Sequence, residues 1–205
     1  MSDQSSARFS CYALDKFVGH RLSLLTRCGA NPVDEPPNWI TVFVLNSALN
    51  STIDVRKYTY SLNFLRRVEE AISSYREGTA RLLDYVQSPG RSISTYFRSL
   101  SHFEICIGQL WQAHCLLSKP ENIFLFEKGD GSREERLNKI YNATKHMEER
   151  IAAGNFPEDS PSVLWLTNRD ISCVDASVSF AELEETLRFV HELANGIAEL
   201  SLILK

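Results

Sequence analysis

Apolar residues recur every three or four positions along most of this 205-residue chain, which is the spacing of an amphipathic helix. The pattern is strongest in four stretches, and it predicts helices over residues 60–86, 94–118, 132–153 and 179–197. Short loops between long amphipathic helices favour antiparallel neighbours. The predicted fold class is therefore all-α, an antiparallel bundle of four long helices with shorter helices before it.

Two of the four helices begin with the sequence signature of a capping box. Ser132 is followed three residues later by Glu135, and Ser179 is followed in the same way by Glu182. In this motif the hydroxyl accepts a hydrogen bond from one unpaired helix amide, and the carboxylate accepts from another. Gly154 supplies a C-terminal stop for the first of these two helices.

The N-terminal part of the chain is predicted to add two shorter helices. Residues 9–27 have apolar positions at helical spacing, and residues 32–38 contain three prolines, which indicates a loop. The apolar segment 39–49 is rich in β-branched residues, so both a helix and a strand fit its pattern. We favour a helix with Asn38 as its N-cap.

The pattern changes between the last two long helices. Residues 163–167 and 171–178 are rich in β-forming residues and flank a polar turn, which predicts a small β-hairpin or extended flap before the last helix. We interpret residues 1–205 as a single domain, in which residues 1–58 are an N-terminal extension and residues 59–205 form the bundle.

Composition narrows the classes of function. The net charge is −4 and the isoelectric point is about 5.8, which argues against a protein that coats nucleic acid, because that mode needs many Lys and Arg residues at the phosphates. The polar first eight residues lack the apolar region of a secretory signal, and no apolar run is long enough to span a bilayer. We therefore expect a cytoplasmic protein without membrane attachment.

The five cysteines are odd in number, and their spacings match no zinc site. They are Cys11, Cys28, Cys106, Cys115 and Cys173. We interpret them as free thiols in a reducing cytosol. The chain also has no glycine-rich phosphate loop with a Walker lysine, and we expect neither a metal nor a cofactor.

The helix predicted over residues 132–153 carries the candidate for chemistry. Asn142 and His146 are four residues apart, so they lie on one face of this helix, away from its apolar stripe. Histidine is suited to proton transfer near neutral pH. A solvated polar face, which many bundle helices have, explains the same pattern. The apolar stripe consists of Leu137, Ile140, Tyr141, Thr144, Met147 and Ile151.

The segment Tyr141–His146, with the sequence YNATKH, resembles the late-helix motif of the HEPN superfamily. These proteins are all-α bundles of prokaryotic toxin, defence and RNA-processing systems. Their motif is an Arg followed after four to six residues by His, often with Asn directly after the Arg. Asn142 and His146 supply the second half of this motif. The resemblance covers residues 60–205 and implies metal-independent RNA cleavage, with His146 as general acid or base.

The resemblance also implies roles for neighbouring residues. Asn142 is the second catalytic candidate, because it would orient His146 or hold a phosphate or ribose hydroxyl. The residues expected to bind the substrate are Arg136, Lys139, Tyr141 and Lys145. The implied partners are RNA or a nucleotide, a second copy of the chain in a homodimer, and a protein of a defence or toxin–antitoxin system.

The sequence departs from the family motif at one position. Tyr141 stands where the family has its Arg, and Arg136 projects about 80° around the helix from the sector of His146. Lys145 would supply charge, but it lacks the fork of a guanidinium. The alternative function is a catalytically inert bundle that serves as a binding or dimerisation module, and the missing Arg favours it. In both cases we expect His146 to be accessible to solvent.

Other polar and aromatic residues have structural interpretations. His114 falls on an apolar face and is predicted to be a hydrogen-bonded core residue. The pairs Glu69–Glu70 and Glu184–Glu185 are predicted to be solvated charges rather than acid–base pairs. Trp39 and Trp165 are interpreted as packing anchors.

Overall fold

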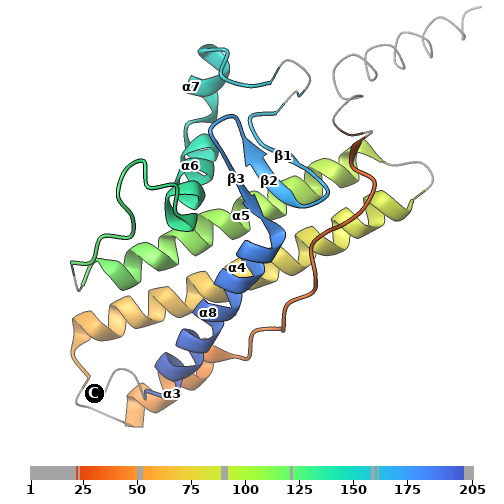
Figure 1. The fold of residues 1–205 in the computed structure, drawn as a ribbon. Helices are drawn as coiled ribbons and strands as arrows, with labels where there is room; N and C mark the ends of the chain where they lie inside the picture. The colour runs from red at the N-terminus through yellow and green to blue at the C-terminus, as the bar shows by residue number, and fades with distance from the viewer. Residues whose placement is uncertain are drawn as a thin grey trace, which may run out of the picture.

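The computed structural model describes residues 22, 24–49, 53–88, 92–120, 122–157, 160 and 162–200. Most of the helix predicted over residues 9–27 lies outside these ranges, and residues 25–38 are not helical. Helices make up most of the structure, and a small antiparallel sheet precedes the last helix (Figure 1). This confirms the predicted mostly helical fold with a β element in that place.

Two long helices, α4 (Val55–Gln87) and α5 (Ile93–Ser118), form the centre of the fold. They are antiparallel, because the end of α4 meets the start of α5, where the ring centres of Tyr85 and Tyr96 are 5.6 Å apart. Both helices bury long apolar stripes. α4 begins before the predicted residue 60 because the Asp54 carboxylate caps the amides of its first turn.

Helices α3 (Trp39–Leu49) and α8 (Phe180–Ala198) pack against each other and against α4. The buried Trp39 donates from Nε1 to Asn195 Oδ1 at 2.7 Å and so joins α3 to α8. Its ring also contacts that of His191 edge to face, with 4.9 Å between the centroids. The helical interpretation of residues 39–49 and the anchoring role of Trp39 are therefore confirmed.

The start of α3 is capped differently from the prediction. The Ile40 amide donates to Glu69 Oε1 of α4 at 3.2 Å. The Asn38 side chain makes no hydrogen bond within the described residues, although its carbonyl accepts from the Val42 amide. Glu69, predicted to be a solvated charge, thus supplies the cap from another helix. Partial burial against α3 raises the pKa of the Glu69 carboxyl.

The predicted long helix over residues 132–153 is divided into α6 (Arg133–Lys145) and α7 (Met147–Ala152). The break is at His146, whose backbone angles of φ −113° and ψ 38° are not helical. Ile151, predicted to lie in the inner stripe, is 52% exposed and lies in α7, beyond the break. Gly154, with φ 66°, ends α7 as predicted.

Three short strands lie between α7 and α8. The strands are β1 (Trp165–Leu166), β2 (Asp170–Cys173) and β3 (Ala176–Ser179), in the antiparallel order β1-β2-β3. Ile171 pairs with Leu166 on one side and with Val178 on the other, and all three side chains are buried. The Leu166 amide donates to Tyr96 Oη at 3.1 Å, which fixes the sheet to the start of α5.

Residues 24–38, here called the strap, run from the β1–β2 turn along α8 and α4 to the start of α3 (Figure 1). At the first end, Asn168 Oδ1 accepts from the amides of Thr26 at 2.8 Å and Arg27 at 3.0 Å. A Cβ at Gly29 would overlap the Asn168 carbonyl oxygen, so only glycine allows this close approach.

Glu184, predicted to be solvated, is instead buried beneath the strap and is only 8% exposed. Its Oε1 accepts from the Asn31 amide at 2.7 Å and from Tyr75 Oη at 2.8 Å. The carboxylate therefore joins α8, α4 and the strap. Burial of the ring and the hydrogen bond to Glu184 raise the pKa of Tyr75.

No helix in the described part of the chain is both long enough and apolar enough to cross a membrane. The described cysteines Cys28, Cys106, Cys115 and Cys173 carry free thiols, as predicted. Cys11 lies outside the described residues.

Candidate functional site

His146 lies at the surface, at the junction between α6 and α7. Its side chain is 45% exposed, and its Nδ1 is 3.4 Å from Glu149 Oε2. The His146 amide donates to the carbonyl of Asn142 at 3.0 Å, which is the last helical hydrogen bond of α6. The predicted accessibility of His146 is confirmed, although the residue ends a helix instead of lying within one.

Asn142 and Tyr141 direct their side chains elsewhere. Asn142 Nδ2 donates to Asn138 Oδ1 at 2.9 Å. Tyr141 is half-buried against α5, with its ring centroid 6.4 Å from that of Trp111. The structure thus places Asn142 next to His146 along the helix but forms no hydrogen bond between their side chains.

Arg136 is bound to α8. Its Nη2 donates to Glu182 Oε1 at 2.6 Å and its Nη1 to Glu182 Oε2 at 3.2 Å. Nη1 also donates to the carbonyl of Ser177 at 3.0 Å. Hydrogen bonding from Arg136 is the main cause that lowers the pKa of the Glu182 carboxyl to about 2. Ten residues of helix, or about 15 Å, separate Arg136 from His146 along the chain, and the structure does not bring them together.

Lys139 is also paired, and its partner Glu135 corrects one sequence prediction. Ser132 Oγ accepts from the Glu135 amide as a capping box requires. The Glu135 carboxylate, however, accepts from the amides of Gly129 at 2.7 Å and Gly131 at 2.8 Å, and these bonds lower its pKa. Lys139 Nζ lies 3.1 Å from the same carboxylate. Glu135 is therefore 3% exposed and stabilises the preceding loop.

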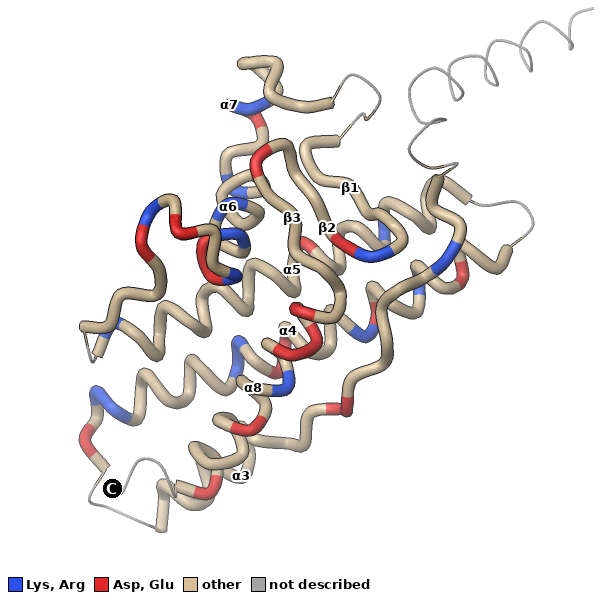
Figure 2. The backbone as a smooth tube through the Cα atoms, in the orientation of Figure 1, with Lys and Arg blue, Asp and Glu red and all other residues tan. Residues whose placement is uncertain are grey.

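Lys145 is the one predicted substrate-binding cation that forms no ion pair or hydrogen bond with another described residue. It is exposed and lies directly before His146, at the last turn of α6. Figure 2 shows Lys and Arg positions interspersed with acidic ones along α6 and the loop before it.

His114 is buried as predicted, but the predicted hydrogen bond is not formed with any residue that the structure describes. The residue is 6% exposed, and neither ring nitrogen has a partner among the described residues. Burial lowers the pKa of the imidazole, with opposing effects from the nearby charges of Glu134 and Arg133. The role of His114 in proton chemistry is therefore limited by its lack of access to solvent.

Glu104 is a perturbed carboxyl that sequence reasoning did not single out. Burial on α5 raises its pKa to about 7. It precedes Gly108 by one turn, and Gly108 faces the ring of Tyr141, so Glu104 lies on the side of α5 that α6 covers. Its position between Phe103 and Ile105, in an apolar stretch of sequence, was the available signal.

A groove beside the first turns of α4 was also not predicted. We call it the α4 groove, and it has a volume of 550 Å³. Its lining residues are Asp54, Val55, Arg56, Thr59, Tyr60, Asn63 and Leu116. Arg56 and Tyr60 are four residues apart and thus share a face of α4, a spacing that the sequence alone displays but that becomes a groove only when Leu116 of α5 lies opposite.

Within the described residues, no three side chains of His, Cys, Asp or Glu gather in positions that could hold a metal ion. Comparisons with protein-family models, with curated proteins and with solved structures find no match to this chain.

Proposed function

We propose that this chain is a HEPN-like helical module that works by binding rather than by catalysis, and that it forms a homodimer through the exposed face of α3. Two features support the proposal. The predicted cations around His146 are largely paired with carboxylates, and α3 leaves an apolar stripe in solvent. The second feature carries the proposal.

Metal-independent cleavage of a phosphodiester needs a cation that stabilises the developing negative charge. Arg136 is bound to Glu182, and Lys139 is bound to Glu135. Releasing Lys139 would leave the buried Glu135 carboxylate without its cation, which is costly. The remaining Lys145 is a point charge on a flexible stem and not a planar fork. These pairings favour a module that does not cleave RNA.

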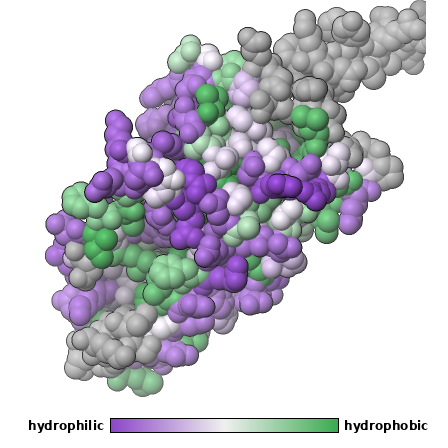
Figure 3. Space-filling view, in the orientation of Figure 1, coloured by the Kyte–Doolittle hydropathy of each residue, from purple (hydrophilic) through white to green (hydrophobic). Residues whose placement is uncertain are grey.

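α3 presents an apolar stripe to solvent. Val42 is 40% exposed, Leu45 is 60% exposed and Leu49 is 89% exposed. Their spacing of three and four residues places them on one face, beside the face that buries Trp39 and Phe43. Hydrophobic side chains reach the surface at the end of the molecule where α3 lies (Figure 3). Such a contiguous patch is typical of an interaction site.

A second copy of the chain is the partner that this stripe fits. A two-fold dimer brings the same patch of both subunits together, so the patch must be complementary to itself. The eleven residues of α3 include no charged side chain. Two such helices therefore meet without repulsion between like charges, and the contact removes apolar surface from water.

Light scattering after size-exclusion chromatography tests the dimer at a protein concentration of about 100 µM, in the micromolar range where small interfaces associate. We expect a dimer for the wild type and a monomer for Leu45→Glu, which places a charge in the stripe. The control is Leu83→Glu on α4, where the side chain is 43% exposed, and it should remain dimeric. A monomeric wild type, or a dimer that tolerates Leu45→Glu, contradicts the proposal.

An RNA cleavage assay in the presence of EDTA tests the absence of catalysis. We expect no cleavage by the wild type, and we expect His146→Ala to leave the dimer unchanged. Cleavage that disappears in a folded His146→Ala protein would instead establish the catalytic interpretation and exclude a purely binding function.

A further inference from the structure

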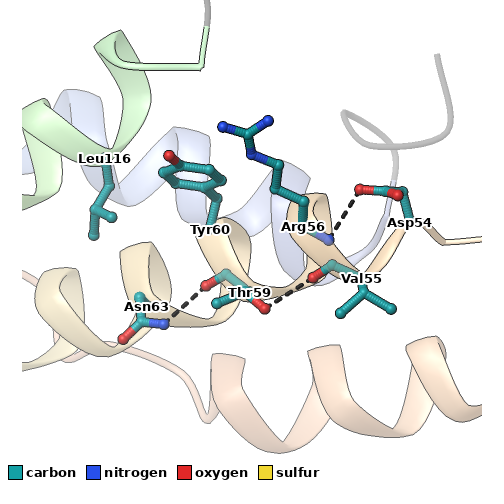
Figure 4. A pocket seen from close by; sticks show the side chains of 7 residues that line it. All are labelled: Asp54, Val55, Arg56, Thr59, Tyr60, Asn63 and Leu116. Carbon is teal, nitrogen blue, oxygen red and sulfur yellow. Dashed lines mark hydrogen bonds between the residues drawn. The ribbon is translucent and has the colours of Figure 1, made fainter.

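The lining of the α4 groove includes none of the apolar α3 residues through which the dimer is proposed to form. Its volume of 550 Å³ falls within the range of about 300–1,000 Å³ that small-molecule sites occupy. In Figure 4, Leu116 of α5 lies beside the ring of Tyr60, and Arg56 rises from α4 on the same side as Tyr60. The groove therefore combines an apolar wall with a cation and a phenol.

The polar groups of the groove divide into used and unused donors. Thr59 Oγ1 donates to the Val55 carbonyl at 2.8 Å, and Asn63 Nδ2 donates to the Thr59 carbonyl at 2.9 Å (Figure 4). The Arg56 guanidinium and the Tyr60 hydroxyl, by contrast, form no hydrogen bond or ion pair with any described residue. These two groups are the donors that the groove offers to a ligand.

The amides of Arg56 and Lys57 at the start of α4 are not available to bind a ligand. Asp54 Oδ1 accepts from the amides of Arg56 at 2.9 Å and Lys57 at 3.1 Å, so the helix end already has its anion. Figure 2 shows the basic positions of these first turns next to the acidic one that precedes them. A ligand must therefore bind the Arg56 side chain itself, and it must tolerate the negative charge of Asp54 at the rim.

We propose that the α4 groove binds a small monocarboxylate with an apolar body. The carboxylate accepts hydrogen bonds from the Arg56 guanidinium, whose fork matches two oxygens, and from the Tyr60 hydroxyl. The apolar body lies against Leu116 and the Tyr60 ring. A doubly charged phosphate fits less well, because one guanidinium balances only part of its charge and Asp54 repels the rest.

The test uses 4-phenylbutyrate, which has one carboxylate and an apolar body, titrated into the protein with amide chemical shifts as the readout. We expect saturable shifts at Tyr60 and Leu116, with a dissociation constant on the order of 1 mM for a ligand of this size. Arg56→Gln should weaken binding by about tenfold. The matched control is Lys57→Gln, which removes an adjacent positive charge outside the groove and should change the affinity by less than about twofold.

Two further probes separate the carboxylate contact from simple apolar binding. The neutral 4-phenylbutyramide should bind the wild type about tenfold more weakly and should not distinguish the wild type from Arg56→Gln. Phenyl phosphate should bind more weakly than 4-phenylbutyrate. Absence of saturable shifts, equal losses in Arg56→Gln and Lys57→Gln, or equal binding of acid and amide would each overturn the proposal.

Discussion

The guanidinium of Arg136 and the carboxylate of Glu182 form a two-point ion pair that joins α6 to the first turn of α8. The same carboxylate accepts from the amide and hydroxyl of Ser179, so it completes the capping box of α8 at the same time. Arg136 therefore has a structural role, and the region that the sequence assigns to substrate binding is part of the contact between two helices.

Arg136→Met should lower the free energy of unfolding by about 1–3 kcal/mol near pH 7, because it removes a charge-assisted pair that is about two-thirds buried. The Glu182 pKa in the folded protein is about 2, below its ordinary value of 4.5. The pair therefore stabilises the fold fully above about pH 4.5, and this contribution is lost as the pH falls toward 2. Urea unfolding of both proteins across this range measures the difference.

The control for this pair is Arg188→Met, which removes an exposed guanidinium of α8 that has no partner among the described residues. We expect a change of less than about 0.5 kcal/mol. Equal losses in Arg136→Met and Arg188→Met would show that the pair contributes nothing specific.

His114 should make the protein sensitive to mild acid. Burial lowers the pKa of this imidazole below its ordinary value of 6.5, with Glu134 and Arg133 as the charges that act on it. The unfolded chain then binds a proton more readily than the folded one, so stability falls as the pH drops below about 6.5. His114→Leu should remove this part of the pH dependence, whereas His102→Leu on the same helix should retain it. Thermal unfolding between pH 5 and 8 distinguishes the two.

Glu104 should have the opposite pH dependence. Burial raises its pKa to about 7 from an ordinary 4.5, so the folded state holds the proton more tightly and stability falls as the pH rises through that window. Glu104→Gln should therefore stabilise the protein by about 1–2 kcal/mol at pH 8 and leave it unchanged at pH 4. The exposed Glu192→Gln serves as the control. A destabilised Glu104→Gln at pH 8 would point to a required carboxylate at this position.

Two glycine substitutions should act in opposite directions. Gly29→Ala places a Cβ against the Asn168 carbonyl oxygen and should cost about 2 kcal/mol or more, because the strap must move away from the β1–β2 turn. Gly108→Ala lies within α5, and its Cβ would be 4.0 Å from the Tyr141 ring, an ordinary contact. It should stabilise the protein by about 0.5–1 kcal/mol through helix propensity. Chemical denaturation of both variants provides the comparison.

Periodicity and local caps determined much of the helical layout. The stripe that predicts a helix over residues 94–118 agrees with α5 to within one residue at its start, because its apolar spacing and the Pro120 that follows are local properties of the chain. The Ser179–Glu182 capping box was also readable, since every atom that it needs lies within four consecutive residues. Stops such as Gly154 are local in the same sense.

Whatever depended on a distant partner was decided by the tertiary structure. Glu184 is buried because Asn31 and Tyr75, each far from it in sequence, surround its carboxylate. The predicted helix breaks at His146, although no Gly or Pro next to His146 in the sequence indicates a break. After the break, an ion pair of 2.8 Å between Arg150 and Asp175 joins α7 to the β2–β3 turn. Contacts between residues that are distant in sequence cannot be predicted from the spacing of apolar and polar positions.

In the candidate site, too, some features were predictable from the sequence and others depended on the tertiary structure. The sequence determined that His146 is exposed, because its position four residues after Asn142 places it on the polar face. It did not determine that His146 ends α6 instead of lying within a longer helix. Only the tertiary structure decided that Arg136 is bound to Glu182 and that Arg56, beside Leu116, has no partner among the described residues. The physical reason is that the partner of a charged side chain depends on which helices pack together, and periodicity records that a face is polar but not what lies across from it.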